Sequence, residues 1–126
     1  MKKIIYPKVG GPESIEIINE KLEEAVESQV KVRVYRAGIN FADLMMRQGL
    51  YGSNPDFPFT PGYEVSGIII GMGGDVENLK IGDRVIAMTG FGGYAEEVIV
   101  SSNRIIPMPN NMSFDQAAAM PVTYGT

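Results

Sequence analysis

Cysteine and histidine are both absent from this 126-residue chain. With only the residues of this chain, thiolate nucleophiles, Ser-His-Asp triads and the usual Cys and His zinc sites are therefore excluded. A metal ion would have oxygen ligands alone, which suit calcium or magnesium better than zinc. The lack of cysteine also agrees with a cytoplasmic location, because disulfides belong mainly to oxidising compartments.

Basic side chains and long apolar runs are scarce as well. Eleven Lys and Arg stand against 15 Asp and Glu, which gives a net charge of −4. Proteins that bind duplex nucleic acid usually carry a basic face, so nucleic acid is not an expected partner. No stretch approaches the roughly 18–20 apolar residues of a membrane span or the roughly 7–15 of an export signal. We interpret six glutamates between residues 13 and 27 as a solvated turn between two strands.

Alternating apolar and polar residues predict short strands. Ile15 and Ile17, and then Val30, Val32 and Val34, repeat with the period of two that marks a strand with one buried face. Further strands are predicted over residues 64–72, 83–89, 94–100 and 104–108, separated by glycine-containing turns. Many short strands in one domain-sized chain with 15 glycines indicate a mainly β fold with short helices, arranged as a compact, partly open β-barrel.

Two segments have helical signals. Residues 40–48 contain no Gly or Pro, with Asn40 as a predicted N-cap and Asp43 suited to the helix dipole. Ser113 is a predicted N-cap for a second helix, which Pro121 would kink or end. Because the sequence ends at Thr126 without completing that element, we expect the protein to continue into another domain.

Residues 90–95 fit the dinucleotide fingerprint G-x-G-x-x-A literally. That fingerprint must open a helix whose N-terminus holds a pyrophosphate. Residues 96–100 instead continue as an alternating, β-branched run. The segment is therefore predicted to be a hairpin turn.

Six ordered segments resemble one family: residues 37–43, 47–51, 60–67, 82–85, 93–96 and 113–119. They are similar to the medium-chain dehydrogenase/reductase superfamily, and within it to the zinc-free quinone oxidoreductases, a branch that includes ζ-crystallin-like enzymes and vesicle amine transport protein homologues. The resemblance implies a GroES-like catalytic domain over residues 1–126, with residues 113–126 beginning the interdomain helix. It also implies a Rossmann domain, which is missing from this sequence.

The resemblance further implies hydride transfer from NADP(H) or NAD(H), bound mainly by the missing domain, to a small-molecule quinone or activated alkene (enone). Asn40 matches a cofactor-facing Asn that also serves the reaction, Tyr51 matches a Tyr lining the substrate cleft, and Thr126 matches a Thr near the nicotinamide. Met45 stands where many relatives have a second Tyr, which implies a more apolar substrate.

The same resemblance implies a site without zinc. Asn40 and Tyr63 stand where zinc alcohol dehydrogenases have a Cys and a His ligand, and neither side chain replaces those ligands. Glu64, beside Tyr63, is then expected to pack or form a salt bridge.

Two other functions remain open at this point. One is an enoyl-thioester reductase of the same superfamily, and the other is a non-catalytic binding or adaptor protein on this scaffold. In each case we expect residues 1–126 alone to be inactive. We also expect them to self-associate through apolar residues 117–124.

Overall fold

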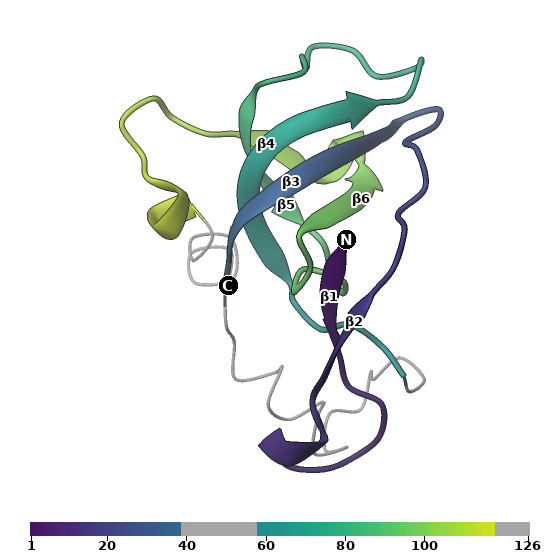
Figure 1. Ribbon diagram of the computed structural model, residues 1–126. Coiled ribbons are helices and arrows are strands. Elements are labelled where there is room, and N and C mark those ends of the chain that lie inside the picture. Colours follow the sequence, from purple (N-terminus) through teal and green to yellow (C-terminus); the bar gives the residue numbers. More distant parts are fainter. Residues whose placement is uncertain (39–57, 118–126) are drawn as a thin grey trace.

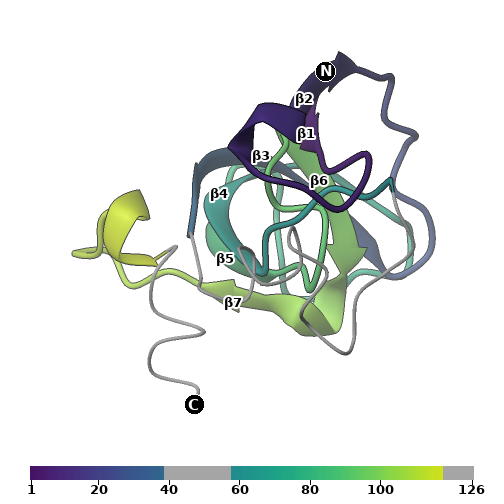
Figure 2. The same cartoon turned by 90° about the horizontal axis from the view of Figure 1, so that it is seen from below.

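The computed structural model describes residues 1–38 and 58–117, and the strands within them form two antiparallel sheets (Figures 1 and 2). A two-stranded sheet pairs β1 with β2, and a five-stranded sheet has the order β6-β3-β4-β5-β7. Their bounds are β1 (Lys2–Ile5), β2 (Glu16–Asn19), β3 (Gln29–Ala37), β4 (Glu64–Met72), β5 (Arg84–Met88), β6 (Glu97–Ser101) and β7 (Ile105–Pro107). Two short 3₁₀ turns, η1 (Pro12–Ser14) and η2 (Ser102–Arg104), complete the pattern. The predicted mainly β fold is confirmed.

Most of the individual strands were predicted correctly. β4 has the predicted bounds, and β5 and β7 fall inside the predicted ranges, whereas β6 begins and ends later than predicted. β1 was missed, because its sequence Lys-Lys-Ile-Ile does not alternate. β1 forms through tertiary pairing instead: it pairs along its length with β2, and Ile4 donates its N–H to the carbonyl of Tyr94 at 2.9 Å.

The six glutamates between residues 13 and 27 are exposed, as predicted, but they do not form a single turn. Glu13 lies in η1 and Glu16 lies in β2, while the other four glutamates lie between β2 and β3. The expectation that Ile17 belongs to a buried face was wrong, since 71% of this residue is exposed. Among the described strands β2 pairs only with β1, so the short ribbon is left with one open face.

The core lies inside the curved five-stranded sheet, whose strands surround a common centre in Figure 2. Val30 and Val32 of β3 are fully buried, which confirms the predicted alternation there. They pack in one cluster with residues of β4, β5 and β6: Val65, Ile69, Val85, Ala87, Val98 and Val100. β3 and β4 approach so closely that a Cβ on Gly67 would lie 1.9 Å from the carbonyl oxygen of Arg33. Glycine is therefore required at the centre of the sheet.

The C-terminal helix begins as predicted and docks against the outside of the sheet. The Ser113 hydroxyl accepts from the Gln116 N–H at 3.1 Å, and the Gln116 side chain accepts from the Ser113 N–H at 3.0 Å, which is a capping box. Ser66 of β4 donates to the Phe114 carbonyl at 2.5 Å, and Arg84 of β5 donates to the Met112 carbonyl at 2.8 Å. The first helical turn is thereby fixed to two central strands.

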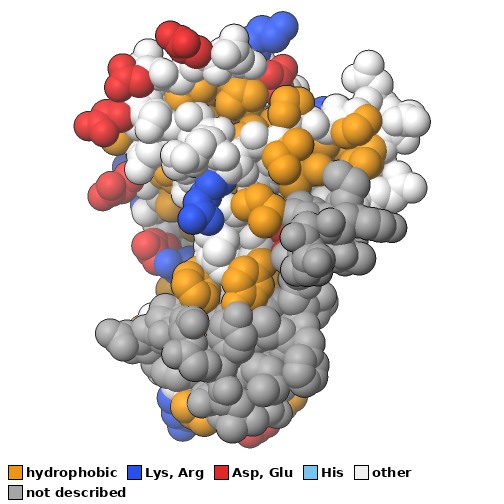
Figure 3. All heavy atoms as spheres, turned by 180° about the vertical axis from the view of Figure 1, so that it is seen from behind, with side chains coloured by type: hydrophobic (Ala, Val, Ile, Leu, Met, Phe, Trp, Pro, Cys, Tyr) orange, Lys and Arg blue, Asp and Glu red, His pale blue; other side chains and the backbone are white. Residues whose placement is uncertain are grey.

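The surface mixes apolar and charged side chains. Hydrophobic side chains are spread over the face seen in Figure 3, while acidic side chains gather along one margin of that face. Within the parts of the chain that the structure describes, no helix is long and apolar enough to cross a membrane.

Candidate functional site

The candidate site lies at the sheet edge where β4 begins and β5 ends. The two strands are antiparallel with Glu64 opposite Met88, so Tyr63, just before β4, lies beside Thr89, just after β5. The Tyr63 carbonyl accepts from the N–H groups of Thr89 at 2.7 Å and Gly90 at 3.2 Å. Residues far apart in sequence are thus brought to one edge by strand register.

Two backbone segments are joined at this edge, and we call residues 60–63 and 89–94 the paired loops. Gly92 donates its N–H to the Thr60 carbonyl at 2.7 Å, and Tyr94 donates to the Pro61 carbonyl at 3.0 Å. Gly62 has a φ of +114°, and a Cβ there would lie 2.7 Å from the Cα of Gly93. The close approach and the left-handed backbone both require glycine, so the paired loops form a tightly specified unit.

Three aromatic rings gather on the paired loops and the residue before them, and we call Phe59, Tyr63 and Phe91 the aromatic ledge. The Phe91 ring centroid lies 6.0 Å from that of Phe59 in an edge-to-face arrangement and 6.1 Å from that of Tyr63. Tyr6 packs behind Phe59 with its ring centroid at 5.5 Å. Although it makes these contacts, Phe91 remains 40% exposed. The ledge therefore presents an apolar aromatic surface to solvent, mainly through Phe91.

Glu64, the first residue of β4 and the neighbour of Tyr63 in the sequence, is only 1% exposed. Its backbone carbonyl accepts from the Gly38 N–H at 3.1 Å, which ties the end of β3 to the start of β4. The burial of Glu64 agrees with the packing role implied by the resemblance.

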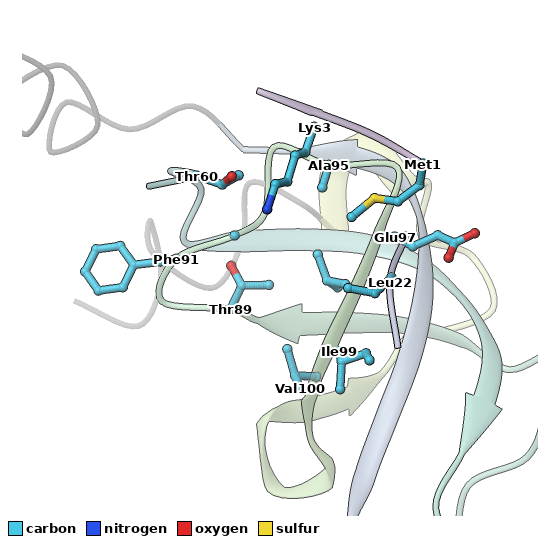
Figure 4. A pocket seen from close by; sticks show the side chains of 12 residues that line it. Met1, Lys3, Leu22, Thr60, Thr89, Phe91, Ala95, Glu97, Ile99 and Val100 are labelled. Atoms are coloured by element: carbon cyan, nitrogen blue, oxygen red, sulfur yellow. The ribbon is translucent and has the colours of Figure 1, made fainter. Parts of the chain in front are cut away.

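A cavity of about 200 Å³ opens beside the paired loops, lined by residues that include Lys3, Thr60, Thr89 and Val100 (Figure 4). The Thr60 hydroxyl oxygen is buried and has no hydrogen-bond partner among the described residues. Lys3 forms an ion pair with Glu20 at 2.5 Å. In Figure 4 the Phe91 ring is directed away from the other lining side chains. Phe91 thus lines the cavity, but its ring extends outward from it.

The residues predicted for the site are only partly covered by the structure. Asn40, Tyr51, Thr126 and Met45 lie outside the described residues. Tyr63 lies within the described residues and belongs to the ledge. Phe91 was missed as a candidate, although an aromatic residue between glycines in a predicted turn could have pointed to it.

The structure places no nucleotide-binding turn or metal cluster in the described ranges. Residues 90–95 contain no helix and lead into β6, as expected for a segment that is not a dinucleotide site. The prediction of a hairpin was wrong, because β5 pairs with β4 and β7 whereas β6 pairs with β3. Within residues 1–38 and 58–117, no three acidic side chains come close enough together to hold a metal ion. What the edge offers is an apolar aromatic surface with backbone and hydroxyl groups around it, which suits binding of a planar organic molecule.

Comparisons with known proteins agree with this architecture. The alcohol dehydrogenase GroES-like domain family matches residues 26–110. The chain is 42% identical over 126 residues to the synaptic vesicle membrane protein VAT-1 homolog of Danio rerio, covering 99% of this chain and 26% of that protein. It is 47% identical over 98 residues to quinone oxidoreductase-like protein 2 of Bos taurus, covering 78% of this chain and 28% of that protein.

A solved structure has the same fold. Escherichia coli quinone oxidoreductase, complexed with NADPH, superimposes with a TM-score of 0.88 at 32% identity, covering 94% of this chain and 36% of that one. The chain thus spans only about a quarter to a third of the length of these proteins. It belongs to the alcohol dehydrogenase GroES-like domain family, within the medium-chain dehydrogenase/reductase superfamily.

Proposed function

We propose that this chain is the substrate-side catalytic domain of a zinc-independent reductase that acts on quinones or enones with a reduced nicotinamide cofactor. The observation that carries the proposal is the likeness to quinone oxidoreductases over nearly the whole chain. The aromatic ledge supports it, because a planar apolar substrate needs such a surface.

In this proposal a second domain binds most of the cofactor, and the present chain binds the substrate. The described residues offer no glycine turn that opens a helix for a pyrophosphate. A Rossmann domain outside this sequence would therefore bind most of the cofactor, with residues 113–126 beginning the connecting helix. Reading the codons that follow Thr126 tests this directly: a strand followed by G-x-G-x-x-G is expected, and its absence contradicts the two-domain arrangement.

The chemistry follows from the cofactor class. When bound, a reduced nicotinamide supplies a hydride, and a quinone that takes up this hydride and one proton becomes a hydroquinone. The residues of this chain would orient the acceptor and donate hydrogen bonds to it. Asn40, Tyr51 and Thr126 carry these roles in the proposal. Gly38, two residues before Asn40 in the sequence, donates its N–H to the Glu64 carbonyl at the start of β4.

Zinc independence is part of the same proposal. The whole chain has no Cys or His, and the resemblance puts Asn40 and Tyr63 at the ligand positions of the zinc-dependent relatives. A carbonyl acceptor would then be polarised by hydrogen-bond donors rather than by a metal ion.

Turnover by the complete protein tests the reaction. The purified protein should oxidise NADPH or NADH in the presence of menadione or methyl vinyl ketone, and residues 1–126 alone should not. Crotonyl-CoA in parallel identifies an enoyl-thioester reductase, and no turnover with any acceptor would contradict the proposal in favour of a binding protein.

Two substitutions separate the roles of Asn40. Asn40→Asp keeps an acceptor for the predicted helix cap but removes the NH₂ donor, so kcat/KM should fall about ten- to a hundredfold with little change in Tm. Asn40→Ala removes both functions and should also cost about 1 kcal/mol of stability. If Asn40→Asp retains full activity, Asn40 is only a cap.

A further inference from the structure

We propose that Phe91 determines substrate specificity by stacking on the conjugated ring of the acceptor, so that the enzyme prefers fused-ring quinones to small aliphatic enones. This inference rests on the proposed function and adds a substrate class and a residue to it. It starts from one observation: Phe91 is a large aromatic residue that stays 40% exposed although two other rings contact it.

The backbone around Phe91 is held in place on both sides. Gly90 donates to the Tyr63 carbonyl at 3.2 Å, Gly92 donates to the Thr60 carbonyl at 2.7 Å, and Phe91 itself donates to the Thr89 carbonyl at 2.8 Å. Gly90 and Gly92 both have positive φ, at +71° and +93°, which makes the sharp turn that lifts the intervening residue outward. A backbone fixed in this way loses little freedom when a ligand binds to the side chain it carries, which favours binding.

The ring contacts leave Phe91 free to accept a further ring. The plane of the Phe59 ring makes an angle of 75° with the plane of the Phe91 ring, an edge-to-face contact. The plane of the Tyr63 ring is tilted by 38° from that of Phe91. Aromatic groups stack with centroids about 4.5–7 Å apart, so the exposed part of the ring can take a planar ligand in offset geometry. Aromatic faces carry negative charge density, and quinone rings are electron-poor, so the two faces attract each other.

The position of Phe91 on the fold distinguishes it from other exposed apolar residues. Ile106, which is 46% exposed, lies on β7 opposite Ile86 in the middle of β5. Phe91 lies instead on the paired loops that follow the end of β5, beside Tyr63. This is the edge to which Gly38, just before the predicted site residue Asn40, is hydrogen-bonded.

The test compares two acceptors in the complete protein. For Phe91→Ala, the ratio of kcat/KM for menadione to kcat/KM for methyl vinyl ketone should fall about tenfold, mostly through the KM for menadione. A tenfold change corresponds to about 1.4 kcal/mol. Phe91→Tyr keeps a ring and should keep the ratio within about twofold, whereas Phe91→Leu keeps an apolar side chain and should behave like Phe91→Ala.

Ile106→Ala is the matched control, because it also removes an exposed apolar side chain but lies away from the ledge. It should leave the ratio unchanged. An unchanged ratio in Phe91→Ala overturns the proposal, and so does an equal fall for both acceptors, which would indicate a structural role.

Direct binding separates this inference from the proposed function. Equilibrium dialysis of menadione against the complete wild-type protein and the Phe91→Ala variant needs no turnover. If the wild type lacks reductase activity but Phe91→Ala weakens menadione binding about tenfold, the proposed function fails and the ring-binding role of Phe91 stands. If the wild type does not bind menadione, or both proteins bind it equally, the role of Phe91 is wrong whatever the activity.

Discussion

Replacing Gly62 by alanine should destabilise the protein strongly, because this residue combines a strained conformation with a close backbone contact. Its φ is +114°, which costs an L residue with a side chain roughly 1–3 kcal/mol. The new Cβ would also lie 2.7 Å from the Cα of Gly93 and 2.8 Å from the nitrogen of Tyr94, where non-bonded carbon atoms prefer about 3.5–4.0 Å.

The size of the destabilisation follows from the backbone groups that the new Cβ would displace. Relieving the contact shifts Gly93 and Tyr94, which donate to the carbonyls of Gly62 at 3.2 Å and Pro61 at 3.0 Å. Losing two such hydrogen bonds costs about 1 kcal/mol each, so the total loss for Gly62→Ala is about 3–5 kcal/mol. With an m value of about 1.5 kcal/mol/M, the urea midpoint should fall by about 2–3 M.

Two other glycines serve as matched controls. Gly82 has a φ of +95°, but no described heavy atom lies within 4 Å of the place that a Cβ would take, so Gly82→Ala should cost only the conformational strain, about 1 kcal/mol. Gly74 has neither feature, and Gly74→Ala should be neutral or slightly stabilising through the unfolded chain. Urea unfolding followed by circular dichroism gives all three values. If Gly62→Ala lowers the midpoint no more than Gly82→Ala does, the close approach of the paired loops is refuted.

Single contacts and the composition of the chain support three further predictions. Ser113→Ala should lower the free energy of unfolding by about 1 kcal/mol, because it removes the cap on the Gln116 N–H; an unchanged urea midpoint would contradict the capping box. Thr60→Val should raise the free energy of unfolding by about 1 kcal/mol, since it removes a buried hydroxyl without a described partner; a decrease would instead reveal a water bridge in the cavity. Metal analysis of the protein without an affinity tag should find less than about a tenth of an equivalent of zinc, and one zinc per chain would refute the zinc-free site.

Local signals let the sequence predict much of the framework. Alternation with a period of two located β3, because a strand with one buried face repeats its apolar residues at that spacing whatever it pairs with. The apolar run that ends at the glycines of residues 73–74 located β4. The three-residue spacing of Ser113 and Gln116 located the helix start, because a capping box involves only neighbouring residues. The β-branched run after residue 95 separated a turn from a dinucleotide site for the same reason. The roles of Asn40, Tyr51 and Thr126 came from resemblance and stay predictions.

Tertiary structure decided what depends on pairing between distant segments. β1 forms by pairing with β2, and Ile17 is exposed because the ribbon has an open face; neither outcome is encoded in the spacing of nearby residues. Phe59, Tyr63 and Phe91 meet only because the register of β4 against β5 sets Glu64 opposite Met88. Composition and motifs thus determined which elements this protein has and which metal chemistry its residues cannot support. Strand register determined the aromatic ledge, since a shift of one residue would turn the flanking side chains to the other face of the sheet.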